Sequence, residues 1–469
     1  MSFPKTAFFK ITAKANSFHR RWHHLCERYL PVKIENSMWR FNRHRKPSEP
    51  LQGWKLHISA TVVEACEVFA KVVPFLISQD LHFKAPKSLE ELSKINCGLE
   101  YGYPQVGKFI TVYPTSEKQA VKLARKLHDL TDEFVSISVP FDEQYLPDSS
   151  VFYRYGAFTI IEMKDENGKT YPAVRTPSGK LVPDDRFQAV PKWISDPFRN
   201  IRRIMEKPLG ETPLTTTYKV FRAITQRGKG GTYQALDFTT NVPRFCVVKE
   251  GRRYGEVNWN GQDGYCLVKY EFDVLKTLRR NYKDVPQVFS SFEIDGNFYF
   301  AMECVEGVSL QKLIKLRRRR FSVRQVLWQG VEIAKIIEKI HQSGWIWNDC
   351  KPANLIVTHK KKSLRPIDFE NAYPINKSER FAWKTQSFSR SEKNTTKSGG
   401  KSDDFYAFGA VIYFLLTGKF YDAIEPVEIG KLRRNLPKKL IEITEKLLSD
   451  STLDGSEVRK EFEEILNLL

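Results

Sequence analysis

Apolar and polar side chains alternate along residues 54–59, WKLHIS, and this alternation predicts a β-strand. Successive side chains of a strand point to opposite faces, so Lys55 and His57 are expected on one face and Leu56 and Ile58 on the other. The pattern then changes to apolar residues at helical spacing and later returns to strand-like segments. The helix is expected at residues 61–77, and further strands at residues 108–112 and 150–161. This mixture predicts an α+β domain in the first half of the chain.

The second half has strand-like patterns first and helical patterns afterwards. Strands are expected at residues 218–236, 244–249 and 288–304, and helices at residues 265–280 and from Val323 to just before Gly344. Asp295–Gly296 predicts a hairpin turn within the last strand segment. The most apolar run, Phe405–Leu416, is too short to span a bilayer and predicts a buried helix.

Residues 179–198, GKLVPDDRFQAVPKWISDPF, are rich in Pro and Asp and lack a periodic pattern, which predicts a linker or an extended arm. A domain boundary is therefore expected near residues 200–206. The N-terminal region is basic and aromatic, and its pattern does not assign a structure. We therefore divide the chain into a basic N-terminal segment, a first domain and a second domain, at residues 1–50, 51–205 and 206–469.

The chain is strongly basic, with 75 Lys and Arg residues against 55 Asp and Glu residues and a formal net charge of +20. Such a charge attracts anions, which include nucleic acids, anionic lipids, phosphates and acidic peptides, and it does not choose among them. A basic surface can also serve solubility alone. The runs Arg317–Arg320 and Lys360–Lys362 are typical of solvated turns.

Seven cysteines are scattered along the chain and form no CxxC pair. This spacing argues against a zinc ribbon and a disulfide framework, and it suits a reducing cytosol. No long apolar stretch follows the basic N-terminus, so a secretory signal is not expected. These features predict a cytoplasmic protein without a transmembrane segment, and its 469 residues suit two or three domains.

A group of polar residues in the second half matches the needs of phosphoryl transfer. It lies in residues 347–357, WNDCKPANLIV, and residues 365–373, RPIDFENAY. Phosphoryl transfer needs a group that accepts the hydroxyl proton, a cation near the transferred phosphate and two oxygen ligands for Mg²⁺. Four residues supply these groups in order: Asp349, Lys351, Asn354 and Asp368.

These two segments resemble the catalytic loop and the metal-binding turn of protein kinases. The resemblance implies a bilobal protein-kinase-like fold that uses ATP, or another nucleoside triphosphate, together with Mg²⁺. It implies that Asp349 is the catalytic base and that Lys351 contacts the γ-phosphate. It also implies that Asn354 and Asp368 bind Mg²⁺.

Further kinase elements occur in the expected order. Lys249, in CVVKE, and Glu271, on the next helix, match the ion pair that positions the α- and β-phosphates. The turn QRGKGGTYQALD resembles a glycine-rich loop over the nucleotide, with Gly228, Gly230 and Gly231. Asp404, in DDFYAFG, stands where kinases carry an Asp that supports the catalytic loop.

The second half also departs from ordinary protein kinases at three places. Trp347-Asn348 replaces the His-Arg pair before the base, Glu370 replaces the glycine of Asp-Phe-Gly, and Phe381–Gly400 lacks Ala-Pro-Glu. An Arg before the base normally binds a phosphorylated activation loop. Its absence argues against such a switch and against a general signalling kinase.

Cationic residues recur in strand-like segments of the first half. Lys55 and His57 share a strand face, and Lys84, Lys108 and Arg154 follow in LHFK, GKFITVYP and VFYRYGAF. Such a group suits a substrate that contains phosphate. Taken alone, it is also compatible with an ordinary polar face of a sheet.

Most of residues 35–200 resemble the N-terminal lyase region of class III lanthipeptide synthetases, in WKLHIS, LHFK, GKFITVYP, YLPDSSVFYRYGAF and WISDPF. The resemblance implies a phosphothreonine-lyase-like α+β domain in which Lys84 is the base and His57 protonates the leaving phosphate. It further implies that Lys55 stabilises charge on the substrate carbonyl, that Lys108 and Arg154 bind phosphate, and that Asp142 orients one of these groups.

The two halves together predict a bifunctional kinase–lyase. It would phosphorylate Ser or Thr of a ribosomal precursor peptide and then eliminate phosphate to give dehydroalanine or dehydrobutyrine. The sequence ends at Leu469, where these synthetases continue into a cyclase domain, so a separate cyclase is a possible partner and nucleic acid is not expected. Two alternatives remain: a plain Ser/Thr kinase with an N-terminal docking domain, and a pseudokinase scaffold.

Overall fold

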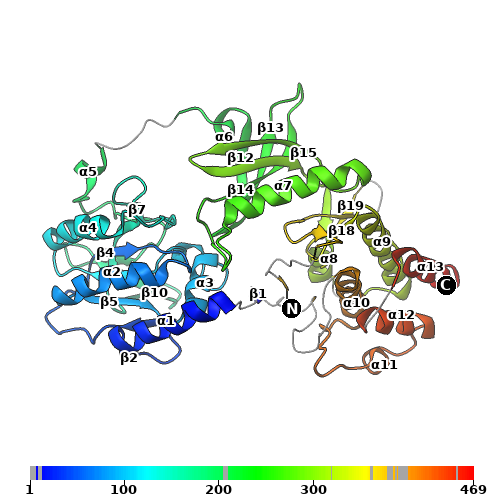
Figure 1. Ribbon diagram of the computed structural model, residues 1–469, viewed down its shortest axis with the longest axis horizontal. Coiled ribbons are helices and arrows are strands. Elements are labelled where there is room, and N and C mark those ends of the chain that lie inside the picture. Colours follow the sequence, from blue (N-terminus) through cyan, green and yellow to red (C-terminus); the bar gives the residue numbers. More distant parts are fainter. Residues whose placement is uncertain are drawn as a thin grey trace.

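The computed structural model describes residues 7–8, 13–203, 210–317, 320–359, 363–377, 384–385, 388, 400–449 and 453–469. Parts of four segments discussed above lie outside these residues. They are the Lys360–Lys362 run, nearly all of Phe381–Gly400, the middle of Arg317–Arg320 and the end of the expected boundary at 200–206. Figure 1 shows the first domain beside a strand-rich lobe, which is followed by a helical lobe.

A seven-stranded antiparallel sheet forms the centre of the first domain. Its strand order is β2 (Val32–Lys33), β3 (Trp39–Phe41), β5 (His82–Pro86), β6 (Ile110–Tyr113), β4 (Gln52–Ile58), β8 (Val151–Ala157) and β7 (Glu143–Gln144). The apolar positions of β4, β5 and β6 pack with three helices into one core. These helices are α1 (Ala13–Tyr29), α2 (Ala65–Ser78) and α4 (Glu117–Thr131). The polar positions of the same strands therefore face away from this core, as the alternation predicts.

The N-terminal region, which we separated at residue 50, packs onto this domain from residue 13 onward. Trp22 and Cys26 of α1 are buried in the core, and β2 and β3 extend the sheet. The helix α3 (Leu89–Cys97) follows β5 and ends at Gly98, whose φ is 76°. The expected division at residue 50 therefore runs through one packed unit.

Residues 179–198, which we call the arm, pack against the first domain along most of their length. The arm begins at β11 (Leu181–Pro183), which forms a small sheet with β9 (Glu162–Lys164) and β10 (Thr170–Arg175). Phe198 is fully buried, with its ring 4.0 Å from that of Tyr153, and Trp193 packs on Tyr155. The arm is thus a part of the first domain, and the linker interpretation of this segment is wrong. Because single aromatic residues anchor the arm, its apolar positions form no periodic pattern in the sequence.

The second domain begins with a five-stranded antiparallel sheet. Its strand order is β12 (Tyr218–Arg227), β13 (Gly230–Asp237), β14 (Arg244–Gly251), β16 (Asn297–Glu303) and β15 (Val288–Ile294). The helix α7 (Gly264–Asn281) packs against this sheet, and the short helix α6 (Pro213–Thr216) comes just before β12 in the chain. The hairpin between β15 and β16 turns at Asp295 and Gly296, as expected.

Helices dominate the rest of the chain. The main ones are α8 (Leu310–Leu316), α9 (Val323–Gln342), α10 (Lys401–Thr417), α11 (Ile429–Leu432), α12 (Lys438–Leu448) and α13 (Gly455–Asn467). Short strands accompany them: β17 (Gly307–Ser309), β18 (Trp345–Ile346), β19 (Leu355–Thr358), β20 (Leu364–Pro366) and β21 (Tyr373–Pro374). Ser322 and Gln325 form a capping box that starts α9, and Gly344 follows its end with a φ of 82°.

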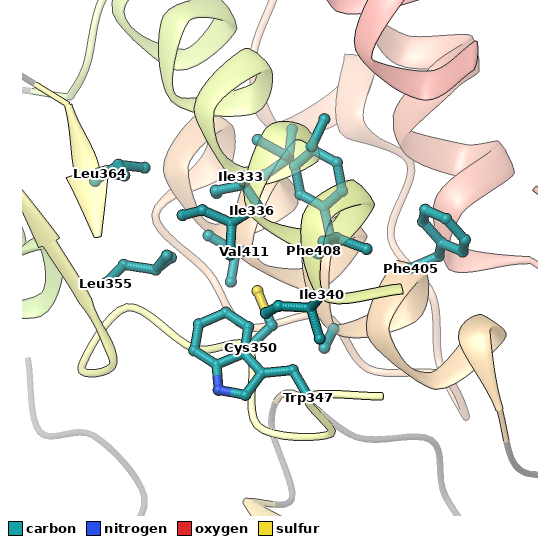
Figure 2. Close-up of a cluster of buried hydrophobic side chains, with 14 of the residues drawn as sticks. Ile333, Ile336, Ile340, Trp347, Cys350, Leu355, Leu364, Phe405, Phe408 and Val411 are labelled. Atoms are coloured by element: carbon teal, nitrogen blue, oxygen red, sulfur yellow. The ribbon is translucent and has the colours of Figure 1, made fainter. Parts of the chain in front are cut away.

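The apolar run Phe405–Leu416 is fully buried within α10, as expected. Figure 2 shows Phe408 and Val411 of this helix among apolar side chains of α9, with Trp347 and Cys350 next to them. The loop that contains Trp347 and Cys350 therefore rests on the core of the helical lobe. In the described part of the chain, no helix combines the length and the apolar character that a membrane span requires.

Candidate functional site

Asp404, on α10, fixes the backbone of the segment that carries the expected catalytic base. Its carboxylate accepts the backbone N–H of Asn348 at 2.7 Å and that of Trp347 at 2.9 Å, and it lies 2.9 Å from Nε2 of His341. Asn348 has a left-handed φ of 61°, which Asn adopts more readily than most residues. The Asn that replaces the usual Arg therefore suits the local backbone.

Asp349 lies at the centre of the expected catalytic group, in the loop between β18 and β19. Its Oδ2 atom is 2.8 Å from Nζ of Lys351 and accepts a hydrogen bond of 2.8 Å from Nδ2 of Asn354. Burial raises the pKa of Asp349 to about 6, although the Lys351 ammonium favours the ionised form. A carboxylate with this pKa is mostly ionised at neutral pH and can accept a hydroxyl proton.

Lys249, on β14, contacts the carboxylates of two other expected site residues. Its Nζ atom lies 2.6 and 2.7 Å from the carboxylate oxygens of Glu271 on α7, and 3.0 Å from Oδ1 of Asp368. Burial alone would lower the pKa of Lys249, but Asp368 and Glu271 raise it above its usual range. The backbone N–H of Phe369 also donates to Glu271, at 3.1 Å. The structure thus brings the expected ion pair next to the expected metal ligand.

The turn between β12 and β13 requires glycine because backbone atoms approach it closely. Gly230 has a φ of 146°, and a Cβ atom at this position would lie 1.8 Å from the carbonyl oxygen of Glu250. A Cβ atom at Gly231 would lie 2.2 Å from the hydroxyl oxygen of Tyr233, at the end of a side chain that can move. Close backbone packing thus explains Gly230, whereas nothing in the backbone around Gly231 requires glycine.

Glu370, which replaces the glycine of Asp-Phe-Gly, has a partner in the glycine-rich turn. It forms an ion pair with Lys229, and both side chains are largely buried. The Lys229 ammonium lowers the pKa of Glu370, even though burial acts in the opposite direction. This pair connects the glycine-rich turn to the turn that carries Asp368. The sequence prediction did not include Lys229, because a charged residue between two glycines has no distinctive pattern.

The oxygen atoms around Asp368 suit a divalent cation. Carboxylate oxygens of Glu271, Asp368 and Glu370 lie within 4.8 Å of one another. Burial would raise the pKa of Asp368, but Lys249 and its cationic neighbours lower it well below the usual range. The carbonyl oxygen of Asn354 accepts the N–H of Ile367, so the two expected metal ligands lie on bonded segments. Mg²⁺ prefers such oxygen ligands, and the residues present fit it.

In the first domain, four of the expected site residues lie on neighbouring strands of one sheet, and Lys108 lies just before β6. Lys55 on β4 pairs directly with Arg154 on β8, while His57 on β4 and Lys84 on β5 both pair with Thr111 on β6. Directly paired residues of antiparallel strands project to the same face. Their side chains line one cavity of about 310 Å³, on the face opposite to the helices.

Asp142 links two residues of this cavity. Its Oδ2 atom contacts Nδ1 of His57, and its Oδ1 atom lies 3.1 Å from Nζ of Lys108. All three side chains are buried. Burial lowers the pKa of His57 to about 3, although the Asp142 carboxylate opposes this shift. His57 is therefore neutral in the free protein, and its Nδ1 contact leaves Nε2 to exchange a proton with a bound group.

Burial among cations also lowers the pKa values of two lysines. The pKa of Lys84 falls to about 7, first through burial and then through Lys55 and Lys108. The pKa of Lys55 falls to about 7 through burial and the charge of Arg154. Because both pKa values lie near 7, each lysine exists in both its neutral and its charged form at neutral pH. A neutral lysine can act as a base.

The sequence prediction did not include several residues of the cavity, among them Trp39, Asp184 and Arg186. The ring of Trp39 lies 4.3 Å from Nζ of Lys84. Asp184, from the arm, lies 2.8 Å from Nη2 of Arg154, and Arg186 of the arm also lines the cavity. All three belong to segments without a clear periodic pattern, so alternation gave no signal for them.

Two known domain families match successive parts of the chain. The family described as RamC, N-terminal domain, matches residues 29–207, and the protein kinase domain matches residues 226–466. The order of these matches confirms the expected fold class and the resemblance on which the expectation was based.

Curated relatives agree with both matches. The "Probable SapB synthase" of Streptomyces coelicolor is 26% identical over 360 residues, which are 74% of this chain and 38% of that protein. "Serine/threonine-protein kinase F" of Synechocystis is 29% identical over 231 residues, which are 45% of this chain and 46% of the relative. "Serine/threonine-protein kinase B" of the same organism is 31% identical over 221 residues, which are 44% of this chain and 38% of the relative. The chain spans less than half the length of these relatives.

Proposed function

Because the chain belongs to the protein kinase family and carries a RamC N-terminal domain, we propose that it phosphorylates Ser or Thr in a precursor peptide and then eliminates the phosphate. The product would be dehydroalanine or dehydrobutyrine, as in lanthipeptide biosynthesis. The observation that supports this proposal is the presence of two sites in one chain. One has the groups for phosphoryl transfer, and the other is a cationic cavity with a lysine whose pKa is about 7.

In the proposed phosphorylation, Asp349 accepts the proton of the peptide hydroxyl as this oxygen attacks the γ-phosphate. Lys351, beside Asp349, stabilises the negative charge of the transferred group. Lys249, fixed by Glu271, binds the phosphates that remain on the leaving nucleotide. Bound Mg²⁺ supplies further charge neutralisation, and Asn354 and Asp368 would hold it.

In the proposed elimination, neutral Lys84 removes the α-proton of the phosphorylated residue. The electron pair of that C–H bond forms the double bond, and the C–O bond to phosphate breaks. Lys55 stabilises the negative charge that develops on the neighbouring carbonyl oxygen, and Lys108 and Arg154 bind the phosphate.

His57 donates a proton to the leaving oxygen. In the free protein His57 is neutral, because burial lowers its pKa to about 3. A phosphate dianion bound beside it favours the imidazolium form. Phosphate binding would therefore prepare the acid at the moment it is needed.

The decisive experiment is to incubate the protein with ATP, Mg²⁺ and a candidate precursor peptide and to measure the peptide mass. A net loss of water is the expected result. Accumulation of phosphopeptide with the wild-type protein would favour a plain Ser/Thr kinase with a docking domain. No mass change with a peptide that demonstrably binds would favour a scaffold without catalytic activity.

Two variants separate the two reactions. Lys84→Ala is expected to accumulate phosphopeptide, because it removes the base of elimination only. Asp349→Asn is expected to leave the peptide unmodified, because no leaving group is installed. If Lys84→Ala still yields dehydrated peptide, the assignment of this lysine is wrong.

A further inference from the structure

The glycine-rich turn of the kinase domain contacts the first domain directly. The backbone N–H of Gly228 donates a hydrogen bond of 3.0 Å to the carbonyl oxygen of Cys97, the last residue of α3. A Cβ atom at Gly228 would lie only 1.7 Å from the carbonyl oxygen of Asn96. This glycine is therefore required by the approach of the first domain as well as by any approach of a nucleotide.

A segment between β14 and α7, residues 252–263, supports the same turn from its other side. The backbone N–H of Arg252 donates to the carbonyl oxygen of Lys229 at 2.8 Å. Glu256 accepts hydrogen bonds from the Arg227 guanidinium at 2.6 and 3.2 Å and from the backbone N–H of Lys229 at 3.2 Å. The Glu256 side chain is almost completely buried, so this charge-assisted contact is shielded from solvent.

The segment 252–263 is anchored in the core of the first domain. Trp259 is buried there, and its ring centroid lies 4.9 Å from that of His19 and 6.2 Å from that of Phe18, both on α1. Arg252 also lies over the ring of Tyr103, which follows α3. In Figure 1, α3 and α1 lie beside the loop that connects β14 to α7.

Backbone strain marks the segment as closely constrained. Tyr254 and Glu256 have left-handed φ values of 61° and 51°, which are unfavourable for residues with bulky side chains. Such conformations persist only where the surrounding contacts determine them, and they are frequent at functional sites.

The segment also leads directly into the helix that carries Glu271. Asp263 accepts the backbone N–H of Cys266 at 2.9 Å as the N-cap of α7, and it accepts the N–H of Tyr254 at 2.7 Å. The start of α7 is thereby tied to the strained part of the segment. The glycine-rich turn and the start of α7 are both parts of the expected nucleotide site, and both are therefore held by the segment that contacts the first domain.

We propose that the first domain positions the nucleotide site of the kinase domain, with Glu256 and Trp259 as positioning residues that act through the glycine-rich turn and α7. This inference rests on the proposed phosphotransfer activity, because it assumes that a nucleoside triphosphate binds below the turn. A glycine-rich turn is intrinsically mobile and loses much conformational freedom when it orders over a ligand. Contacts that order it beforehand reduce this loss and strengthen nucleotide binding.

The test is nucleotide binding by full-length variants, measured with a fluorescent ATP analogue in the presence of Mg²⁺. Trp259→Ala and Glu256→Gln are each expected to raise the dissociation constant roughly tenfold, as expected for loss of a buried charge-assisted or aromatic contact. Glu338→Gln is the matched control, because it changes another Arg–Glu pair, with Arg459 at 2.9 Å, far from the turn. It is expected to leave the dissociation constant unchanged.

Two readouts separate positioning from general destabilisation. In phosphorylation assays, Glu256→Gln is expected to raise the KM for ATP roughly tenfold and to change kcat less than about twofold. Hydrogen exchange of residues 226–231 is expected to become faster in both variants, while exchange within α9 stays the same.

Wild-type nucleotide affinity in Glu256→Gln, with folding retained by circular dichroism, would overturn the inference and leave the proposed phosphotransfer intact. Absence of nucleotide binding by the wild-type protein would overturn both. If Trp259→Ala fails to fold, Glu256→Gln decides the question, since its side chain lies within the kinase domain.

Discussion

Lys55 and Lys84 share one cavity, and after burial the charge of Lys55 is the main cause that lowers the pKa of Lys84. Each pKa falls to about 7, and burial is the largest cause in both cases. The proposed elimination requires Lys84 without its proton and Lys55 with one. The active form therefore carries one proton on the lysine pair, and it is most abundant near pH 7.

This pairing predicts a bell-shaped pH dependence for elimination from a pre-phosphorylated peptide. Below pH 7, Lys84 becomes protonated and loses its basicity, and above pH 7 Lys55 loses its charge. The value of kcat/KM is therefore expected to be highest near pH 7, because it reports the groups of the free enzyme. The measurement is the initial rate of phosphate release from pH 5 to 9.

The variant Lys55→Arg tests the alkaline side of this profile. An Arg guanidinium stays protonated throughout the range, so the decline above pH 7 should disappear while the acid side remains. A profile unchanged by this substitution would show that Lys55 does not determine the alkaline limb.

Asp349 predicts a different pH dependence for phosphorylation. Burial raises its pKa to about 6, and its ionised form is the one that accepts a proton. As the pH rises through 6 the ionised fraction grows, so kcat/KM for phosphorylation should rise and then level off above pH 7. Asp349→Asn is expected to lower the rate about 10²- to 10⁴-fold and to abolish this dependence, as measured by transfer of labelled phosphate.

At the scale of elements, the arm determines part of the cavity wall. Phe198 anchors its end in the aromatic core beside Trp54 and Tyr153, while Asp184 and Arg186 line the cavity. The anchor and the functional residues thus belong to one short segment.

Phe198→Ala is expected to destabilise the first domain by about 3–5 kcal/mol, because it leaves a cavity in a packed aromatic cluster. The measurement is urea unfolding, monitored by tryptophan fluorescence. Phe187→Ala is the matched control in the same arm, since Phe187 is 69% exposed, and its effect is expected to stay within about 0.5 kcal/mol. Equal effects of the two substitutions would contradict the anchoring role of Phe198.

The elements that the sequence predicts well are those whose burial is periodic. The strand of Lys55 and His57 has one face in the core and one face in the cavity, so alternation alone indicates both. The arm has no such regularity, because isolated side chains such as Phe198 carry its packing. The core residues of α1, such as Ala15, Trp22 and Cys26, do lie at helical spacing, so the sequence held a signal for that helix.

The residues of the two sites also differ in how well the sequence predicts them. Asp349 and Lys351 lie in one short motif, so their proximity could be predicted. Asp184 meets Arg154, and Glu256 meets Arg227, through tertiary contacts between segments whose local pattern gives no indication of a partner. The contacts of Asp184 and Glu256 could therefore be identified only from the three-dimensional structure.

At the scale of the whole molecule, the sites of the proposed phosphorylation and of the proposed elimination lie in separate domains. A peptide would therefore have to leave the site of Asp349 before Lys84 could act on it. The two sites have their own residues, and neither Asp349 nor Lys84 contributes to the other site.

This separation predicts that two inactive variants complement each other. Asp349→Asn retains the elimination site, and Lys84→Ala retains the phosphorylation site. When the two variants are mixed with ATP, Mg²⁺ and peptide, dehydrated peptide is expected, because phosphopeptide released by one molecule can bind the other. Mass spectrometry of the mixture is the measurement. Persistent phosphopeptide in the mixture would show that the intermediate does not pass between molecules.

The contact between Asp184 and Arg154 has a consequence for turnover. The carboxylate lies 2.8 Å from the guanidinium, and neither side chain is more than 9% exposed. In the proposed elimination, a substrate phosphate on Arg154 would share the guanidinium with this carboxylate, because Nη2 donates to Asp184 while the buried Nε has no hydrogen-bond partner among the described residues. Asp184 would then compete with the released phosphate of the proposed reaction for Arg154, which would weaken product binding in a strongly cationic cavity.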